Sequence, residues 1–163
     1  MINRRKIVTG MSLLAILGAV PVLAQEVGLQ TTPELDAVNR WRADPATVFR
    51  ADEVDLADFK WIARPVVIFA EAPQQPDYQE QMDLIADRAQ DLADRDVLVV
   101  VDTDPAAFSD LRRQLRPRGF QFTLIGKDGE VKLRKPFPWD VREITRSIDK
   151  MPMRQREIRE GGS

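Results

Sequence analysis

The sequence predicts an α/β domain built around a mixed sheet, and three observations support this fold class. Two apolar runs rich in β-branched residues, 66–70 and 97–101, have the composition of strands that neighbours bury on both faces. Apolar residues repeat at helical spacing after the first run and again near the end of the chain. Two alternating segments flank Asp128-Gly129, a hairpin turn signal. The predicted order is therefore β-α-β-α-β-β-α.

Each helix has its own start signal. Asp77 with Glu80 resembles a capping box, so the first helix is expected to begin there. Asp104 before Pro105 has the pattern of an N-cap and a first helical residue, and Asp140 is expected to cap the last helix. The apolar side chains expected on the first two helices are Tyr78, Met82, Ile85, Ala89 and Leu92, then Phe108, Leu111 and Leu115.

The composition restricts the possible chemistry more firmly than the pattern does. The chain has 163 residues, a net charge of −2, and neither Cys nor His. These absences exclude thiol–disulfide exchange, thiolate or imidazole metal sites, and catalysis by a histidine of this chain. A chain of this length can bury a sufficient core without disulfides.

The first 24 residues have the organisation of a cleaved export signal. Arg4, Arg5 and Lys6 form a basic segment, residues 7–20 are apolar, and small residues precede a cleavage point after Ala24. The apolar run is short for a membrane span of roughly 20 residues. We therefore expect a periplasmic or secreted protein with no stable membrane span after cleavage.

The rest of the chain divides into three expected parts. Residues 25–54 are weakly patterned and are expected to form a partly disordered leader. Residues 55–157 contain the strands and helices of the domain, and residues 158–163 are expected to form a flexible tail. Acidic residues predominate up to about residue 110 and basic residues predominate afterwards.

One segment resembles the thioredoxins. Residues 119–131, Gly-Phe-Gln-Phe-Thr-Leu-Ile-Gly-Lys-Asp-Gly-Glu-Val, look like the thioredoxin segment that enters the third strand and its hairpin. Gln121 stands where thioredoxins have a cis-proline, and the loop 71–76 stands where they have Cys-x-x-Cys. The resemblance therefore implies a single thioredoxin-like domain without the redox site.

A closer resemblance is to the bacterial secreted domain family DUF4174. It rests on Phe-Lys-Trp at 59–61, Arg-Pro-Val-Val-Ile-Phe-Ala at 64–70, Leu-Ile-Gly-Lys-Asp-Gly at 124–129, and Ile-Asp-Lys-Met-Pro-Met-Arg at 148–154. The Met-Pro-Met-Arg ending is the most specific part. The resemblance implies a thioredoxin-like fold, and it supplies no catalytic residues because no activity is established for the family.

Carboxylates at the predicted ends of the strands form one candidate site. Asp102 and Asp104 follow the second strand, while Glu71 and Asp77 flank the end of the first. Together they could hold Mg²⁺, Mn²⁺ or Ca²⁺ through oxygen atoms. Alternatively, Asp102 and Asp104 bond to backbone N–H groups at a strand end and a helix N-cap.

Arginines form a second candidate site next to Gln121. Their guanidinium groups suit the recognition of phosphate or carboxylate, and an anionic envelope polymer or lipid headgroup is one candidate partner. A solvated helix end is the alternative, because cations are stable at a helix C-terminus. The acidic composition argues against nucleic acid. The residues are Arg112, Arg113, Arg116 and Arg118.

Two charged stripes on the predicted helices suggest a helix–helix contact. Acidic and basic residues recur at i, i+4 spacing, which weakens a helix unless an opposite charge lies nearby. We therefore expect the stripes to compensate each other at least partly. They comprise Asp83, Asp87 and Asp91 on the first helix, and Arg142, Arg146 and Lys150 on the last.

These observations favour a non-catalytic envelope protein that binds a partner through the carboxyl ends of the strands. The surface would include loop 71–76, residues 102–104 and residues 118–121. The expected partner is an envelope protein or an anionic envelope component, and no cofactor is expected. The alternative is an enzyme that uses the carboxylates with an oxygen-ligated metal. A structural interaction partner that uses the uneven charge is a third possibility, and the oligomeric state is left open.

Overall fold

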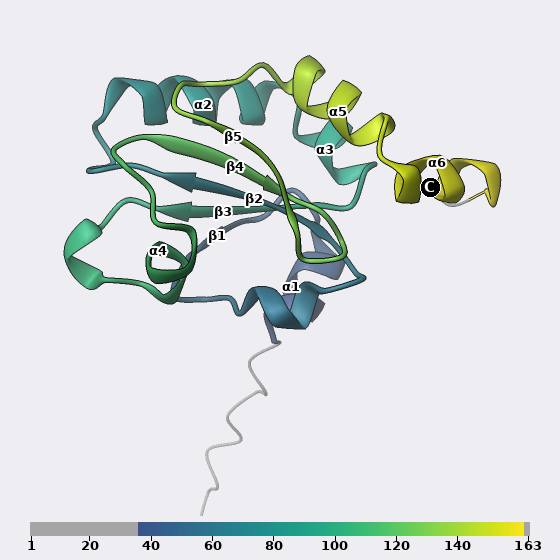
Figure 1. Ribbon diagram of the computed structural model, residues 1–163, viewed down its shortest axis with the longest axis horizontal. Helices are drawn as coiled ribbons and strands as arrows, with labels where there is room; N and C mark the ends of the chain where they lie inside the picture. Colours follow the sequence, from purple (N-terminus) through teal and green to yellow (C-terminus); the bar gives the residue numbers. More distant parts are fainter. Residues whose placement is uncertain (1–35, 162–163) are drawn as a thin grey trace, which may run out of the picture. The chain divides into compact units, whose positions relative to one another are not determined.

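The computed structural model describes residues 36–161, so the predicted export signal and the first part of the predicted leader lie outside the described residues. A five-stranded sheet has the order β1-β3-β2-β4-β5 (Figure 1). Strands β1, β3 and β2 are parallel to one another, β4 is antiparallel to β2, and β5 is antiparallel to β4. The strands are β1 Val48–Arg50, β2 Arg64–Phe69, β3 Val97–Asp102, β4 Gln121–Ile125 and β5 Val131–Lys135.

Helices lie on both faces of this sheet, and the molecule is a single α/β domain with the thioredoxin-like fold that the sequence predicted. No helix within residues 36–161 has the length and apolar character needed to cross a membrane. The helical elements are α1 Ala37–Ala43, η1 Leu56–Phe59, α2 Pro76–Asp87, α3 Ala89–Ala93, η2 Pro105–Ala107, α4 Asp110–Leu115, α5 Val141–Asp149 and α6 Pro152–Arg159.

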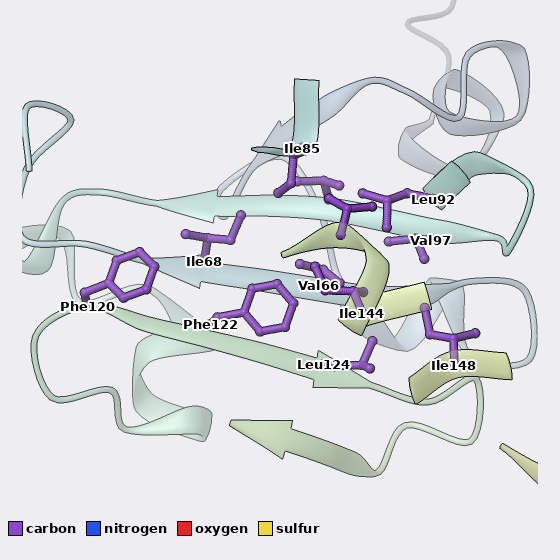
Figure 2. Packing of buried hydrophobic residues seen from close by; sticks show 12 residues of the cluster. Val66, Ile68, Ile85, Leu92, Val97, Phe120, Phe122, Leu124, Ile144 and Ile148 are labelled. Atoms are coloured by element: carbon purple, nitrogen blue, oxygen red, sulfur yellow. The ribbon is translucent and has the colours of Figure 1, made fainter. Parts of the chain in front are cut away.

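Helices α2, α3 and α5 cover one face. Their apolar stripes pack on alternate residues of the strands, and Figure 2 shows this layer from close by. The fully buried Phe122 also makes an edge-to-face contact with Trp139, whose ring centroid lies 5.7 Å away. The labelled core residues are Val66, Ile68, Ile85, Leu92, Val97, Phe120, Phe122, Leu124, Ile144 and Ile148.

Helices α1, η1 and α4 cover the opposite face. Here α1, η1 and α4 contribute Trp41, Phe59, Leu111 and Leu115 to a second buried cluster. Successive strand residues point to opposite faces, so Val67 belongs to this cluster while Val66 and Ile68 belong to the other. The continuous apolar runs in the sequence are explained by this burial on both faces.

The second half of the predicted leader contains two ordered elements of the domain. Residues 37–43 form α1 and residues 48–50 form the edge strand β1, which pairs with β3. Phe49 is fully buried, and the Trp41 indole N–H donates to the carbonyl of Val97 at 3.2 Å. The domain therefore begins before residue 55, and a strand of three residues is too short to leave a recognisable pattern.

Some predicted helix boundaries also differ. Helix α2 begins at Pro76 after Gln75, so Asp77 lies in its first turn and is not its cap. Phe108 does not join the apolar side of α4, because Ser109 caps that helix by accepting a hydrogen bond from the N–H of Arg112. Asp140 caps α5 as predicted, whereas Asp104 caps the separate short helix η2 and not α4.

A further helix follows the predicted last helix and reaches the start of the expected tail 158–163. Pro152 ends the predicted last helix but also begins α6, which continues to Arg159. Arg154 in the first turn of α6 is buried. An ion-pair network explains its burial, and it involves several of the segments on which the family resemblance rests.

Candidate functional site

Hydrogen-bond donors of the protein already contact Asp102, the central carboxylate of the predicted metal site. Asp102 ends β3 and is buried. Its carboxylate accepts hydrogen bonds from Arg112 Nε at 2.8 Å, from the backbone N–H of Asp104 at 3.3 Å, and from the hydroxyl of Ser109. Charge-assisted bonds of this kind are strong. Asp102 is therefore neutralised by an arginine and has little capacity left for a metal ion.

Arg112 cross-links the carboxyl ends of two central strands. Its Nη2 donates to the carbonyl of Ala70 at 2.6 Å and to that of Asp102 at 3.0 Å. The guanidinium carbon also lies 5.5 Å from the centroid of the Phe69 ring. Because the Arg112 side chain is only 11% exposed, this residue is not the solvated helix end that the sequence allowed as an alternative. It closes the end of the sheet where the sequence predicted a binding surface.

The other predicted carboxylates are dispersed. Asp104 caps η2 by accepting from the N–H of Ala106 at 3.0 Å. Glu71 is exposed, and its backbone N–H donates to the side chain of Gln75 at 2.9 Å. Asp77 is half-buried in the first turn of α2. Within residues 36–161, no three acidic side chains are placed to share a metal ion.

The remaining predicted residues do not form one surface with Arg112. Arg113 is exposed, pairs with Asp110, and donates to the carbonyl of Phe108 at 2.8 Å. Arg116 is the exposed C-cap of α4, and Arg118 is exposed in the following loop. Gln121 pairs with Phe69 across β2 and β4, and its amide donates to the Thr123 hydroxyl at 2.9 Å.

A groove on the other side of α4 is the better candidate site. It lies between η1, α4 and the β4–β5 hairpin and has a volume of about 620 Å³. Apolar residues line much of it, and several of them belong to the core of this face. Helices η1 and α4 have four and six residues, so they leave part of the sheet face uncovered. These apolar lining residues are Leu56, Phe59, Leu111, Leu115 and Ile125.

The acidic side chains around the groove are already bonded. Asp52 pairs with Arg50 at 3.0 Å, and this hydrogen bond lowers the pKa of Asp52. Asp55 caps η1 by accepting from the N–H of Ala57 at 2.9 Å, and Asp110 pairs with Arg113. The negative charge at the rim is therefore largely compensated by protein groups.

Lys60 differs from these residues. It lines the groove at the end of η1, and its ammonium group lies 5.6 Å from the centroid of the Trp61 ring. Among the residues that the structure describes, no carboxylate lies within 4.0 Å of its nitrogen. The groove therefore combines an apolar lining with one cation that forms no ion pair in this part of the chain.

Phe108 borders the groove in an unusual backbone conformation. Its φ is 46° and its ψ is 47°, which is the left-handed region that costs a non-glycine residue energy. Its side chain is 69% exposed. Backbone strain of this kind is often found at binding sites. The sequence predicted Phe108 on the apolar side of a helix, although Ser109 followed by Asp110 is a usable signal that α4 begins after Phe108.

The family follows from a direct comparison. Residues 55–157 match the model described as "Domain of unknown function (DUF4174)". The chain belongs to the DUF4174 family. This span includes the groove residues Lys60 and Phe108 together with most of α6.

Solved structures resemble this DUF4174 protein at low sequence identity. Thioredoxin peroxidase I from Plasmodium yoelii is 16% identical, covers 69% of this chain and 87% of its own, and has a TM-score of 0.44. The mitochondrial 2-Cys peroxiredoxin from Plasmodium falciparum is 15% identical, with 71% and 91% coverage and a TM-score of 0.43. The likeness concerns the fold alone. A comparison with curated proteins found no match.

Three of the segments that carry the DUF4174 resemblance meet in one ion-pair network. Arg64, at the start of β2, is 1% exposed and contacts both carboxylate oxygens of Glu157, at 2.8 and 2.9 Å. Lys127 contacts Glu157 at 3.0 Å and Asp96 at 2.7 Å, and Arg154 contacts Glu157 at 3.3 Å. These DUF4174 residues therefore hold α6 against the amino end of the sheet, and we assign them a structural role.

Proposed function

We propose that this DUF4174 protein is an exported, non-catalytic binding domain of the cell envelope that holds a ligand in the groove between η1 and α4. The observation that carries the proposal is the groove itself. Its volume of about 620 Å³ lies within the range of roughly 300–1,000 Å³ for small-ligand sites. The apolar part of its lining is also typical of such sites.

The chemistry at the carboxyl ends of the strands supports a non-catalytic role. Arg112 bonds to Asp102 and Ala70 there, which leaves no open cation site at Asp102. The chain has no cysteine for thiol chemistry. The alternative of a metal-dependent enzyme has less support, because Asp102 would first have to lose its ion pair with the buried Arg112.

Export rests on the sequence of the first 24 residues. Their basic and apolar segments are the whole support for an envelope location. We expect the mature protein to begin at Gln25 and to be released with the periplasmic fraction of a bacterial host. Intact-mass measurement of the released protein checks both points, and a full-length cytoplasmic product would contradict them.

Binding in the groove can be tested with Nile red, a neutral apolar dye whose fluorescence rises on burial. Ala106 and Ala107 are neighbouring exposed residues of η2, and Ala107 lines the groove while Ala106 does not. We expect saturable fluorescence with the wild-type protein and with Ala106→Trp. Ala107→Trp should weaken binding at least about tenfold, because the indole fills the groove. Equal binding by all three proteins would contradict the proposal.

A further inference from the structure

We infer that the groove binds a small amphipathic carboxylate, which is a molecule with an apolar body and a single anionic carboxylate group. This inference rests on the proposed function and specifies the ligand of the same groove. It follows from the lining, from the charges at the rim, and from the scarcity of exposed apolar residues around the groove.

The apolar body follows from the lining. Leu111 and Leu115 of α4 and Phe59 of η1 contribute apolar surface from two sides, and Ile125 of β4 contributes it from the sheet. Burial of apolar ligand surface against such residues is favourable in proportion to the area removed from water. A ligand without an apolar part would gain no binding free energy from burial against these residues.

The carboxylate follows from Lys60. The acidic residues of the rim are bonded to Arg50, Arg113 or the N-terminus of η1, whereas Lys60 has no ion-pair partner in the described part of the chain. Its Cε lies 3.9 Å from the position that a Cβ of Gly129 would occupy, so its side chain lies against the hairpin turn. One compact ammonium charge among the lining residues of the groove complements one carboxylate.

A small molecule fits this site better than a protein surface. Protein interfaces of standard size bury about 800 Å² per partner around a core of large apolar residues. Of the exposed large hydrophobic residues in the described part of the chain, Phe108 and Val131 border the groove. Two such residues provide too little surface for a stable protein interface, but they extend a small-ligand site.

Isothermal titration calorimetry with sodium octanoate and 1-octanol tests the inference, because the two ligands share an apolar chain and differ in charge. We expect octanoate to bind the wild-type protein more tightly than octanol. Lys60→Gln should reduce this preference about fivefold, the upper range for one exposed ion pair. Lys150→Gln is the matched control, because Lys150 is an exposed lysine of α5 on the other face, and it should keep the preference.

The outcomes test the ligand class separately from the existence of a binding site in the groove. If Nile red and octanol bind the wild-type protein and not Ala107→Trp, while octanoate shows no preference that depends on Lys60, the carboxylate inference is overturned and the groove remains a binding site. If octanoate binds Ala107→Trp as tightly as the wild-type protein, its site lies elsewhere and the inference is also overturned. If Nile red, octanol and octanoate all fail to bind the wild-type protein, the proposed function fails as well.

Discussion

Arg112 shows how the environment of one side chain decides its role. In the sequence it is one of four arginines near the end of a short helix, and nothing distinguishes it from Arg113. In the structure Arg112 lies over Phe69 and bonds to Asp102, while Arg113 is exposed. The difference depends on how α4 packs against the sheet, and residue spacing along one short helix does not specify this packing.

We predict that Arg112→Ala destabilises the protein by about 3 kcal/mol or more. The substitution leaves the Asp102 carboxylate, whose side chain is 4% exposed, without its cation in a site with little water. It also removes a donor from the carbonyl of Ala70. Urea denaturation at neutral pH measures the change in the free energy of unfolding.

Arg113→Ala is the matched control for this measurement. Its side chain is 65% exposed and its pair with Asp110 lies on the surface, so the loss should stay below about 1 kcal/mol. Similar losses for the two variants would show that Arg112 is not the cross-link described above. The double variant Asp102→Asn with Arg112→Met should recover part of the loss, because it removes both buried charges.

Gln81 is a second residue whose importance could not be predicted. It is fully buried on α2 and bonds to both backbone polar groups of Trp139, at 2.8 and 3.1 Å. A glutamine next to the apolar stripe of a predicted helix is usually solvated. Its actual role is to hold the segment between β5 and α5 in place, and only the meeting of two distant segments reveals this role.

Ion pairs rather than apolar packing hold helix α6 in place. Its one buried residue is Arg154, and Ile158 is 50% exposed. Burial alone would raise the pKa of Glu157, but hydrogen bonds from Lys127 and Arg64 outweigh it and hold this pKa below its ordinary value of 4.5. The docking of α6 therefore depends on the ionised form of Glu157.

The direction of this pKa shift fixes the pH dependence. A carboxyl whose pKa is lower in the folded state contributes stability above its unfolded pKa and loses it as the pH falls through the folded value. We predict that Glu157→Gln costs about 2 kcal/mol at pH 7, the scale of a hydrogen bond to a charged group. The difference from the wild-type protein should stay constant down to about pH 5 and shrink below it.

Denaturant titrations of both proteins at a series of pH values check this prediction. Glu160→Gln is the control, because Glu160 is exposed at the end of the same helix and forms no ion pair among the described residues. The stability of the Glu160→Gln variant should follow that of the wild-type protein at every pH. A difference for Glu157→Gln that grows as the pH falls would contradict the ionised network.

The predicted pairing of charged stripes across two helices is not what the structure shows. Arg146 pairs with Glu143 of its own helix, and Asp91 pairs with Arg88. The pair that joins the two regions is Arg95 with Asp149, and it has the opposite arrangement of charge. Spacing correctly identifies which residues share one side of a helix. It does not show which sides of two helices meet.

At the scale of the whole molecule, the sequence predicted the order of the elements and the fold. The runs 66–70 and 97–101 and the turn at Gly129 were sufficient, because burial on both faces and hairpin formation leave strong local patterns. The edge strand Val48–Arg50 was missed because three residues carry too little pattern. The groove was missed because it results from the short lengths of η1 and α4.

The corrected start of the domain leads to a prediction about truncation. A chain of residues 55–161 contains the family-matched span but lacks Trp41 and Phe49, both buried in the second core. Loss of one buried aromatic side chain costs about 3–5 kcal/mol, and domains of this kind have a total stability of about 5–15 kcal/mol. We expect this chain to melt without a cooperative transition, whereas residues 36–161 should melt cooperatively.

Thermal melts followed by near-ultraviolet circular dichroism compare the two chains. A full-length chain with Trp41→Ala and Phe49→Ala provides a control for truncation as such, and it should also lose most of its stability. A sharp melt for residues 55–161 near that of residues 36–161 would restore the boundary that the sequence suggested.

The ion pair between Arg64 and Glu157 also has a consequence for folding during translation. Arg64 begins the central strand, yet the carboxylate that contacts it lies 93 positions later in the chain. A nascent chain that has emerged only as far as α5 would have to bury this guanidinium without the Glu157 carboxylate, which is unfavourable. We therefore expect the sheet to reach its full stability only after Glu157 has been made. Until then we expect the nascent chain to remain largely unfolded.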